Sequence, residues 1–154
     1  MSSGGRKTSM SALFVVLIGG MLPAVFWGVT AVLQKQSAVH GTGPAYYLAA
    51  FGLVIALAGF VASQVWRDAS WTSQGVGYAA MAGVTFSLGT GLISFALWQY
   101  QAPLSKLAPI WSCNVLVTVA ISALLLGEAS QLNLMRLGFG AIFIVVGAFL
   151  VTYA

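Results

Sequence analysis

Apolar residues in this chain gather into five long runs that are separated by short polar segments. Each run has 20 to 24 residues, and an α-helix of about 20 residues crosses a hydrocarbon core of about 30 Å. The pattern predicts an all-α, polytopic membrane protein. We expect a five-transmembrane-helix bundle that forms one domain over residues 10–154, after a disordered polar tail over residues 1–9. The predicted helices cover about residues 10–33, 45–66, 75–97, 107–126 and 134–153.

Composition strengthens this prediction. Hydrophobic residues make up 60% of the chain and charged residues 5%, with a mean hydropathy of +0.97. A soluble domain has about a quarter of its residues charged, so the surface of this chain is expected to face the lipid bilayer. The formal net charge is +4. The basic residues stand singly or in one pair at the ends of apolar runs, which argues against nucleic-acid binding.

The distribution of basic residues predicts an orientation. With five spans, four basic residues lie on the N-terminal side of the membrane and two lie on the other side. Cytoplasmic segments are enriched in Lys and Arg, so we expect a multi-pass protein of the bacterial inner membrane with a cytoplasmic N-terminus. The small bias leaves insertion in both orientations open. The first group is Arg6, Lys7, Arg67 and Arg136, and the second is Lys35 and Lys106.

The third run carries small residues at every fourth position. In lipid no hydrophobic force drives helices together, so close packing depends on small residues that let the backbones approach. The spacing favours a packing seam along this helix, although Gly and Ala are also common in membrane helices in general. The seam residues are Gly75, Ala79, Gly83, Ser87 and Gly91.

Small residues and prolines also mark the first and fourth runs. Gly20, Ala24 and Gly28 repeat the four-residue spacing in the first run, and Gly28 is assigned a structural role. Pro23 removes a backbone donor within the first predicted helix and should kink it. Pro109 lies near the start of the fourth predicted helix and is also assigned a structural role.

Few residues in this chain are suited to catalysis. Its acids are Asp68 and Glu128 and its histidine is His40, and all three are predicted near membrane interfaces. Its lone cysteine, Cys113, lies in an apolar run and builds neither an internal disulfide nor a cysteine-based metal site. An enzyme needs positioned acids, bases or metal ligands. We therefore expect no enzymatic activity, no metal and no cofactor.

Several polar or amphipathic side chains are predicted at membrane depth. An amide in hydrocarbon needs a hydrogen-bonding partner or a water-filled cavity, so Asn114 is a candidate for substrate contact. An interhelical hydrogen bond is the structural alternative for Asn114. Trp27 lies deep in the first run, directly before Gly28, where it would line a cavity. Tyr47 and Trp98 lie nearer to helix ends, where an interfacial aromatic belt is the alternative.

Short motifs follow one another along the chain. They are Phe26-Trp27-Gly28 with Lys35, then Gly89-Thr90-Gly91 with Phe95-Ala96-Leu97, then Leu124-Leu125-Leu126-Gly127-Glu128, and finally Leu137-Gly138 with Val146-Gly147-Ala148. In this order, on a five-helix framework, the chain resembles one EamA-type repeat of the drug/metabolite transporter superfamily. The resemblance covers nearly the whole chain after the polar tail.

The resemblance implies that this chain is half of a transporter. In that superfamily two repeats of inverted topology usually form a ten-helix protein around a central cavity, and inverted repeats with a site at their interface recur among transporters. Because the number of spans is odd, a tandem duplication of such a repeat would invert the second copy automatically. A single repeat is therefore expected to pair as an antiparallel homodimer or with a paralogous five-helix partner.

The resemblance also gives individual residues candidate roles. Glu128 would cap or anchor the cytoplasmic end of the fourth helix. An aromatic, mostly uncharged substrate path would suit neutral, zwitterionic or apolar small molecules. The candidate residues of this path are Trp27, Lys35, Tyr47, Trp98 and Asn114.

The leading hypothesis is a transporter of small metabolites or drugs that works by alternating access. The alternative is a non-transporting accessory or structural subunit of a larger membrane complex, which the single repeat and its small-residue seams favour. A membrane enzyme that acts on lipids is a third interpretation, and the scarcity of acids and histidines opposes it.

Overall fold

The computed structural model of this chain describes residues 14–66, 71–125 and 133–154, and every element within these ranges is helical. Five helices in these ranges are long and apolar enough to cross a membrane. The predicted all-α class and the five long apolar helices are therefore confirmed. These helices are Phe14–Val39, Pro44–Val65, Ser73–Gln99, Leu104–Leu125 and Met135–Thr152.

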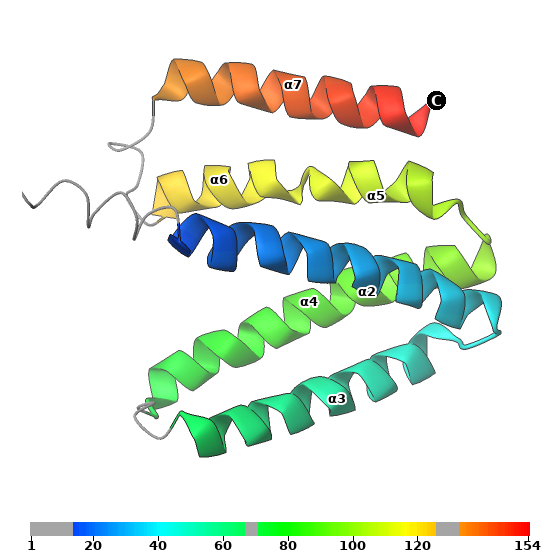
Figure 1. Cartoon of the computed structure of the whole chain (residues 1–154), viewed down its shortest axis with the longest axis vertical. Helices are drawn as coiled ribbons and strands as arrows, with labels where there is room; N and C mark the ends of the chain where they lie inside the picture. The colour runs from blue at the N-terminus through cyan, green and yellow to red at the C-terminus, as the bar shows by residue number, and fades with distance from the viewer. Residues whose placement is uncertain (1–13, 67–70, 126–132) are drawn as a thin grey trace, which may run out of the picture. The chain divides into compact units, whose positions relative to one another are not determined.

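Two of the five long helices contain an irregularity, so the chain has more helical elements than spans (Figure 1). The polar tail predicted over residues 1–9 and the start of the first predicted helix lie outside the described residues. In chain order, the elements are η1 (Leu17–Met21), α2 (Leu22–Val39), α3 (Pro44–Val65), α4 (Ser73–Gln99), α5 (Leu104–Ser112), α6 (Asn114–Leu125) and α7 (Leu134–Thr152).

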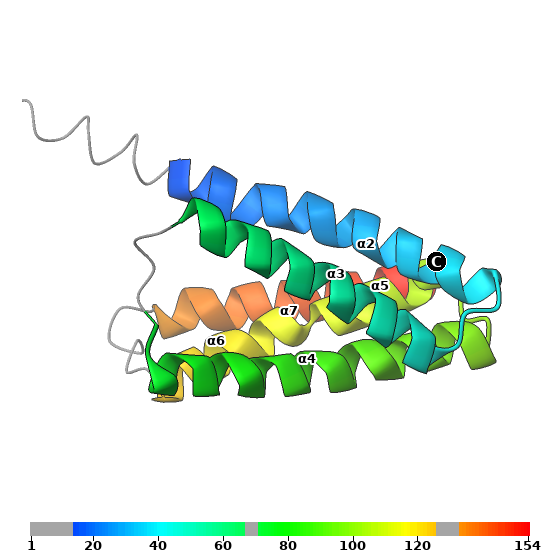
Figure 2. The ribbon, with the colours of Figure 1, turned by 90° about the horizontal axis from the view of Figure 1, so that it is seen from below.

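Contacts divide the chain into two compact units, Met1–Gln101 and Ala102–Ala154. In the first unit, α4 packs against both α2 and α3. There α2 and α4 run in the same direction and α3 runs in the opposite direction (Figures 1 and 2). In the second unit, α5 packs against α7 and runs antiparallel to it (Figure 1). Consecutive long helices within each unit thus alternate in direction, as consecutive membrane spans must.

The first long helix ends later than its hydropathy indicates. The predicted end is Leu33, whereas α2 continues to Val39. Residues 34–36 are Gln, Lys and Gln, which are polar but form helices readily. The chain then turns at Gly41, whose φ of 86° lies in the left-handed region that glycine adopts at little cost. Pro44 begins α3 because its fixed φ suits the first turn of a helix.

A π-helical turn precedes Pro23 in this first long helix. The Leu22 N–H donates to the carbonyl of Leu17, five residues earlier, instead of closing a tighter α-helical turn. Pro23 has no N–H, and its ring would clash with the carbonyl of Gly19 in a regular α-helix. The disruption expected at Pro23 therefore takes the form of a widened turn just before it.

The fourth long helix is interrupted at Cys113, where the sequence predicted one helix over residues 107–126. The Cys113 N–H donates to the carbonyl of Ile110 at 3.1 Å, and the Leu116 N–H donates to the carbonyl of Cys113 at 3.0 Å. Both bonds span three residues, so they tighten the chain and separate α5 from α6. The carbonyl of Pro109, inside α5, accepts from the Cys113 thiol at 3.7 Å.

Few of the described side chains are buried within the chain itself. They belong to α2 and α4, and two of the four are polar. Large apolar side chains on all five long helices are exposed, which is the arrangement that lipid-facing helices require. The buried residues are Gln34, Ala38, Ser94 and Leu97.

Candidate functional site

A buried polar cluster joins α2 to α4 in the first unit. The Gln34 side chain is 6% exposed, and its Nε2 donates to Ser94 Oγ at 2.7 Å and to the Thr90 carbonyl at 3.2 Å. A glutamine amide has two N–H donors, so both are used. Ala38 and Leu97 are buried one turn further along the two helices. The Gln34 amide therefore fixes α2 on α4 at this level.

Lys35 and Trp98, two of the predicted path residues, lie next to this cluster. Lys35 follows Gln34 in α2 and is half-buried. Trp98 lies four residues after Ser94 and shares its helix face, with 37% of the side chain exposed. Because Gln34 contacts Ser94, the structure brings Lys35 and Trp98 to the same end of the first unit.

Tyr47, a third predicted path residue, lies in the first turn of α3 at this same end. Its ring stacks on Phe51 with centroids 5.5 Å apart and an interplanar angle of 13°. Phe51 in turn stacks on Phe86 of α4 at 6.1 Å and 22°. Parallel rings at these distances stabilise packing beyond the area they bury. Tyr47 is therefore half-buried at the end of an aromatic series that links α3 to α4.

The predicted small-residue seam on α4 faces α3 over its C-terminal half. A Cβ added at Gly91 would lie 3.2 Å from Leu48 Cδ1 of α3, so the helices are close at this point. On the N-terminal side of Gly91, a hollow of about 450 Å³ lies between α3 and α4, and Gly83 and Ser87 are among the residues that line it. Its lining is apolar apart from the Ser87 hydroxyl. The lining residues are Leu48, Phe51, Gly52, Ile55, Ala82, Gly83, Phe86 and Ser87.

Trp27 is not brought to the polar cluster. It is 71% exposed on α2 and lies eight residues before Lys35, about 12 Å along the helix. A Cβ added at the neighbouring Gly28 would meet nothing within 4 Å. Among the described residues of the first unit, therefore, no cavity encloses Trp27.

Asn114 lies in the second unit, at the first position of α6 and directly after the interruption at Cys113. Its side chain is exposed. Its backbone carbonyl accepts from Thr118 Oγ1 at 3.1 Å, but within the described ranges no group is hydrogen-bonded to its side-chain amide. The interhelical bond that was the structural alternative is therefore not made by the described residues. Glu128, the predicted anchor of this helix, lies outside them.

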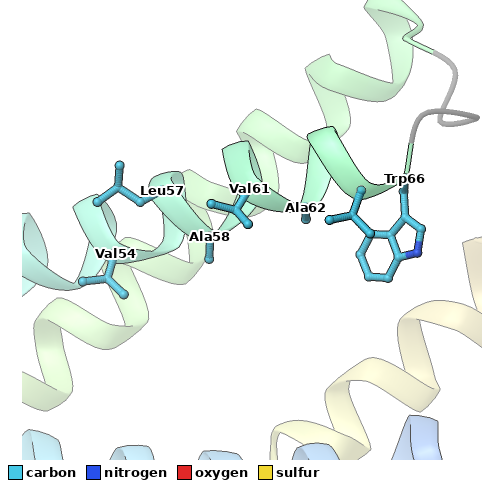
Figure 3. Close-up of a pocket in the computed structure, with 7 residues that line it drawn as sticks. Val54, Leu57, Ala58, Val61, Ala62 and Trp66 are labelled. Carbon is cyan, nitrogen blue, oxygen red and sulfur yellow. The ribbon is translucent and has the colours of Figure 1, made fainter.

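A second hollow, of about 500 Å³, lies along the C-terminal half of α3 (Figure 3). The labelled side chains follow one another along α3, and the Trp66 ring lies at its end. The lining contains no hydroxyl, amide or charged group, so this surface suits lipid or an apolar helix and not a polar ligand. The residues are Val54, Leu57, Ala58, Val61, Ala62, Val65 and Trp66.

The three residues that form the polar cluster are not among the site residues that the sequence predicts. Gln34 falls one residue beyond the predicted end of the first span and was assigned to the following linker. Ser94 and Thr90 are single hydroxyl residues in a long apolar run, where such residues commonly bond to their own helix. The available signal was the Ser94 hydroxyl, because the acceptor at Thr90 is the backbone carbonyl, which a residue of any type offers.

A comparison with protein families, curated proteins and solved structures finds no match for this chain. The similarity to one EamA-type repeat therefore stays a prediction that rests on the motifs in the sequence. Function has to be inferred from the placement of the polar groups in these apolar helices.

Proposed function

We propose that this chain is a multi-pass membrane transporter of small metabolites or drugs that works by alternating access. It acts in a bacterial inner membrane, either with a paralogous five-helix partner while its own N-terminus is cytoplasmic, or as an antiparallel pair of copies of which one has a cytoplasmic N-terminus. The observation that carries this proposal is the interruption of the fourth long helix at Cys113, beside the exposed amide of Asn114.

The interruption lies close to the middle of its helix. Cys113 comes nine residues after Leu104 and twelve residues before Leu125. In a bilayer, irregular backbone at this depth persists only where protein buries it or where it lines a water-filled cavity. Transporters often form their substrate sites near the bilayer midplane from discontinuous helices. A helix that breaks at mid-depth is therefore better suited to a substrate path than to a purely structural span.

The chemistry of Asn114 supports a neutral polar recognition group at this break. A carboxamide carries two donors and an acceptor without a net charge, so it can bind a carbonyl, a hydroxyl or a zwitterionic headgroup. Unpaired polar groups at membrane depth are costly and mark substrate pathways. The amide of Asn114 has this character within the described residues.

Pairing of two chains follows from the need to enclose the substrate path. A substrate path needs walls on all sides, and the five long helices expose large apolar side chains along their lengths. The small bias of basic residues allows two copies to insert in opposite orientations. Two inverted copies would together supply the ten spans and the central site of an inverted-repeat transporter.

Uptake by purified protein in proteoliposomes tests the proposal. We expect uptake above that of empty liposomes for at least one member of a panel of neutral and zwitterionic small molecules. Asn114→Leu should lower it about 3- to 20-fold, the range that one membrane hydrogen bond of about 0.6–1.7 kcal/mol provides. Thr118→Val is the matched control, because the Thr118 hydroxyl bonds to its own helix, and it should leave uptake unchanged.

Uptake equal to that of empty liposomes across the whole panel, for a folded and paired protein, would contradict transport. Stable co-purification with unrelated membrane subunits, together with no self-association on crosslinking, would favour an accessory subunit instead. Labelling of both termini from each side of the membrane would separate a fixed orientation from a dual one.

A further inference from the structure

We propose that α6 is a movable half-helix that closes onto α7 by bending the chain at Cys113, and that it thereby gates the substrate path on one side of the membrane. The role as a gate rests on the proposed function. The movement itself is a property of the second unit, Ala102–Ala154, and can be measured without a substrate.

The first half of the fourth long helix is held on α7. In the second unit α5 packs against α7, and Thr152 Oγ1 of α7 donates to the Lys106 carbonyl of α5 at 3.2 Å. This hydroxyl is shared with the Ala148 carbonyl of its own helix, at 2.8 Å. The hydroxyls of α6, on Thr118 and Ser122, instead donate to carbonyls of α6 itself. Among the described residues, α5 is thus bonded to α7 and α6 is not.

A hollow of about 280 Å³ lies between α6 and α7, because the two halves of the fourth helix draw away from α7 in the direction from α5 to α6 (Figures 1 and 2). In the described part of this unit, α6 packs closely against no other helix. Helices in lipid are held together largely by van der Waals contact, and atoms that border a gap lose such contacts. The lining residues are Leu116, Val119 and Ala120 of α6 and Leu137, Gly138 and Ala141 of α7.

The residues that line this hollow leave room for it to close. Three of them are Ala or Gly, and small residues let helix backbones approach each other closely. A Cβ added at Gly138 would meet nothing within 4 Å. Side chains therefore do not hold α6 away from α7, and movement of α6 onto α7 would add packing contacts.

The interruption at Cys113 supplies the bending point. The Cys113 and Leu116 N–H groups each donate to a carbonyl three residues earlier, so the regular ladder is broken on both sides of Cys113. Pro109 has no N–H, so the Ser105 carbonyl also lacks its regular donor within α5. Helices bend at prolines and at departures from the regular ladder. The bend therefore lies between the half that is bonded to α7 and the half that is not.

The position of Asn114 links this movement to the proposed recognition group. Asn114 precedes Leu116 by two residues, or about 200° around the helix, and Leu116 lines the hollow. Asn114 therefore lies on the face of α6 that points away from α7. Thr118, Ile121 and Leu125 continue this face along the helix. Closing of the hollow withdraws these residues toward α7 and widens the path beside them, and reopening narrows it.

The order of the spans places the gate on one side of the membrane. The fourth span runs toward the side that holds the N-terminus, and α6 is its second half. In an antiparallel pair, the second copy of α6 lies on the opposite side. The two copies thus carry one gate on each side of a shared central site, which is the arrangement that alternating access requires.

Distances between spin labels in the full-length protein in lipid test this movement. The native Cys113 is first replaced by serine, and labelled protein is diluted with unlabelled protein so that each distance lies within one chain. A label at Phe143→Cys of α7 is combined with one at Leu124→Cys of α6 or at Ile110→Cys of α5, and all three positions are exposed. We expect a broad or two-peaked distribution for the α6 pair and a single narrow peak for the α5 pair.

Substitutions that fill the hollow identify the closed position. Gly138→Leu occupies space that is open in this structure, so it should remove the shorter distances of the α6 pair. Ala120→Leu should do the same from the other side of the hollow. Gly140→Leu is the matched control, because a Cβ added there also meets nothing within 4 Å but the residue does not line the hollow. It should leave both distributions unchanged.

Equal widths for the two pairs in the protein without filling substitutions would overturn the movement of α6, and this comparison does not depend on the folding of those variants. A broad distribution for the α6 pair that Gly138→Leu and Ala120→Leu both leave unchanged would also overturn it.

Uptake separates this inference from the proposed function. Gly138→Leu should abolish uptake, and Gly140→Leu should retain it. Movement of α6 without uptake by the unsubstituted protein would contradict transport and hence the gate, whereas uptake with equal widths for the two label pairs would contradict the movement alone.

Discussion

Replacing Gln34 with leucine should destabilise the packing of α2 on α4 by about 1–2 kcal/mol. Leucine keeps most of the side-chain volume but removes both donors, which lie 2.7 Å from Ser94 Oγ and 3.2 Å from the Thr90 carbonyl. Interhelical hydrogen bonds in membranes average about 0.6 kcal/mol each and reach about 1.7. Two average bonds thus contribute about 1 kcal/mol, and complete burial of the amide raises the value toward 2.

The polar groups that remain on α4 limit the loss of stability caused by Gln34→Leu. Ser94 lies four residues after Thr90, so its hydroxyl can turn to the Thr90 carbonyl when Gln34 is absent. Ser94→Ala alone should cost about 0.6 kcal/mol, since Gln34 then keeps its bond to Thr90. The double variant Q34L/S94A should cost no more than Gln34→Leu, which gives a coupling of about 0.6 kcal/mol between the two side chains.

Reversible unfolding in mixed micelles, followed by circular dichroism as the denaturing detergent increases, measures these free energies. Gln36→Leu is the matched control: the same substitution two residues further along α2, at an exposed side chain. A loss of stability for Gln34→Leu that is no larger than for Gln36→Leu would refute the role of the amide. Losses of stability that are additive in the double variant Q34L/S94A would also refute the role of the Gln34 amide.

Two further predictions concern glycines. Gly41→Ala should destabilise by about 1–2 kcal/mol, because the φ of 86° at this position is unfavourable for any residue with a Cβ. Gly43→Ala, at a φ of −68° and with equally open space, should not, and equal effects in the unfolding assay would contradict the reasoning. Gly83→Ala, with nothing within 4 Å, should stabilise α4 by about 0.5–1 kcal/mol. Gly91→Ala should gain clearly less, because its Cβ would lie 3.2 Å from Leu48; an equal gain would show that α3 and α4 are not closely packed there.

The lengths of the apolar runs sufficed to predict five long helices, because hydrocarbon thickness sets the length of a span. Their ends were less predictable. Hydropathy ended the first helix at Leu33, but helix propensity carries residues 34–36 onward until Gly41 turns the chain. Hydropathy also gave no sign of the interruption at Cys113, since the run from 107 to 126 is apolar on average although the polar residues Ser112 and Asn114 flank the cysteine. Only Pro109 hinted at it.

The candidate site was predictable in its residue types and less so in its partners. Asn114 was recognised because an amide in an apolar run is costly wherever the helix packs. Gln34 was overlooked because one residue separated it from the predicted membrane edge. Which helix a polar side chain meets depends on the packing of α2 against α4, and the sequence of one helix does not contain that information. The deep position of Trp27 in the first run predicted a cavity, but the residue is 71% exposed.

The two amides in these apolar helices are therefore not equivalent. Gln34 has both donors bonded within its own unit, so its chemistry is already used in holding α2 on α4. Asn114 is exposed and has no side-chain partner among the described residues. In hydrocarbon such an amide must acquire a partner, and a second copy, a partner subunit, water or a substrate can supply it. Loss of pairing in Asn114→Leu would identify a protein partner, whereas loss of uptake with pairing intact would place the amide in the substrate path, bonded to the substrate or to water. The same substitution thus separates a transporting chain from a structural one.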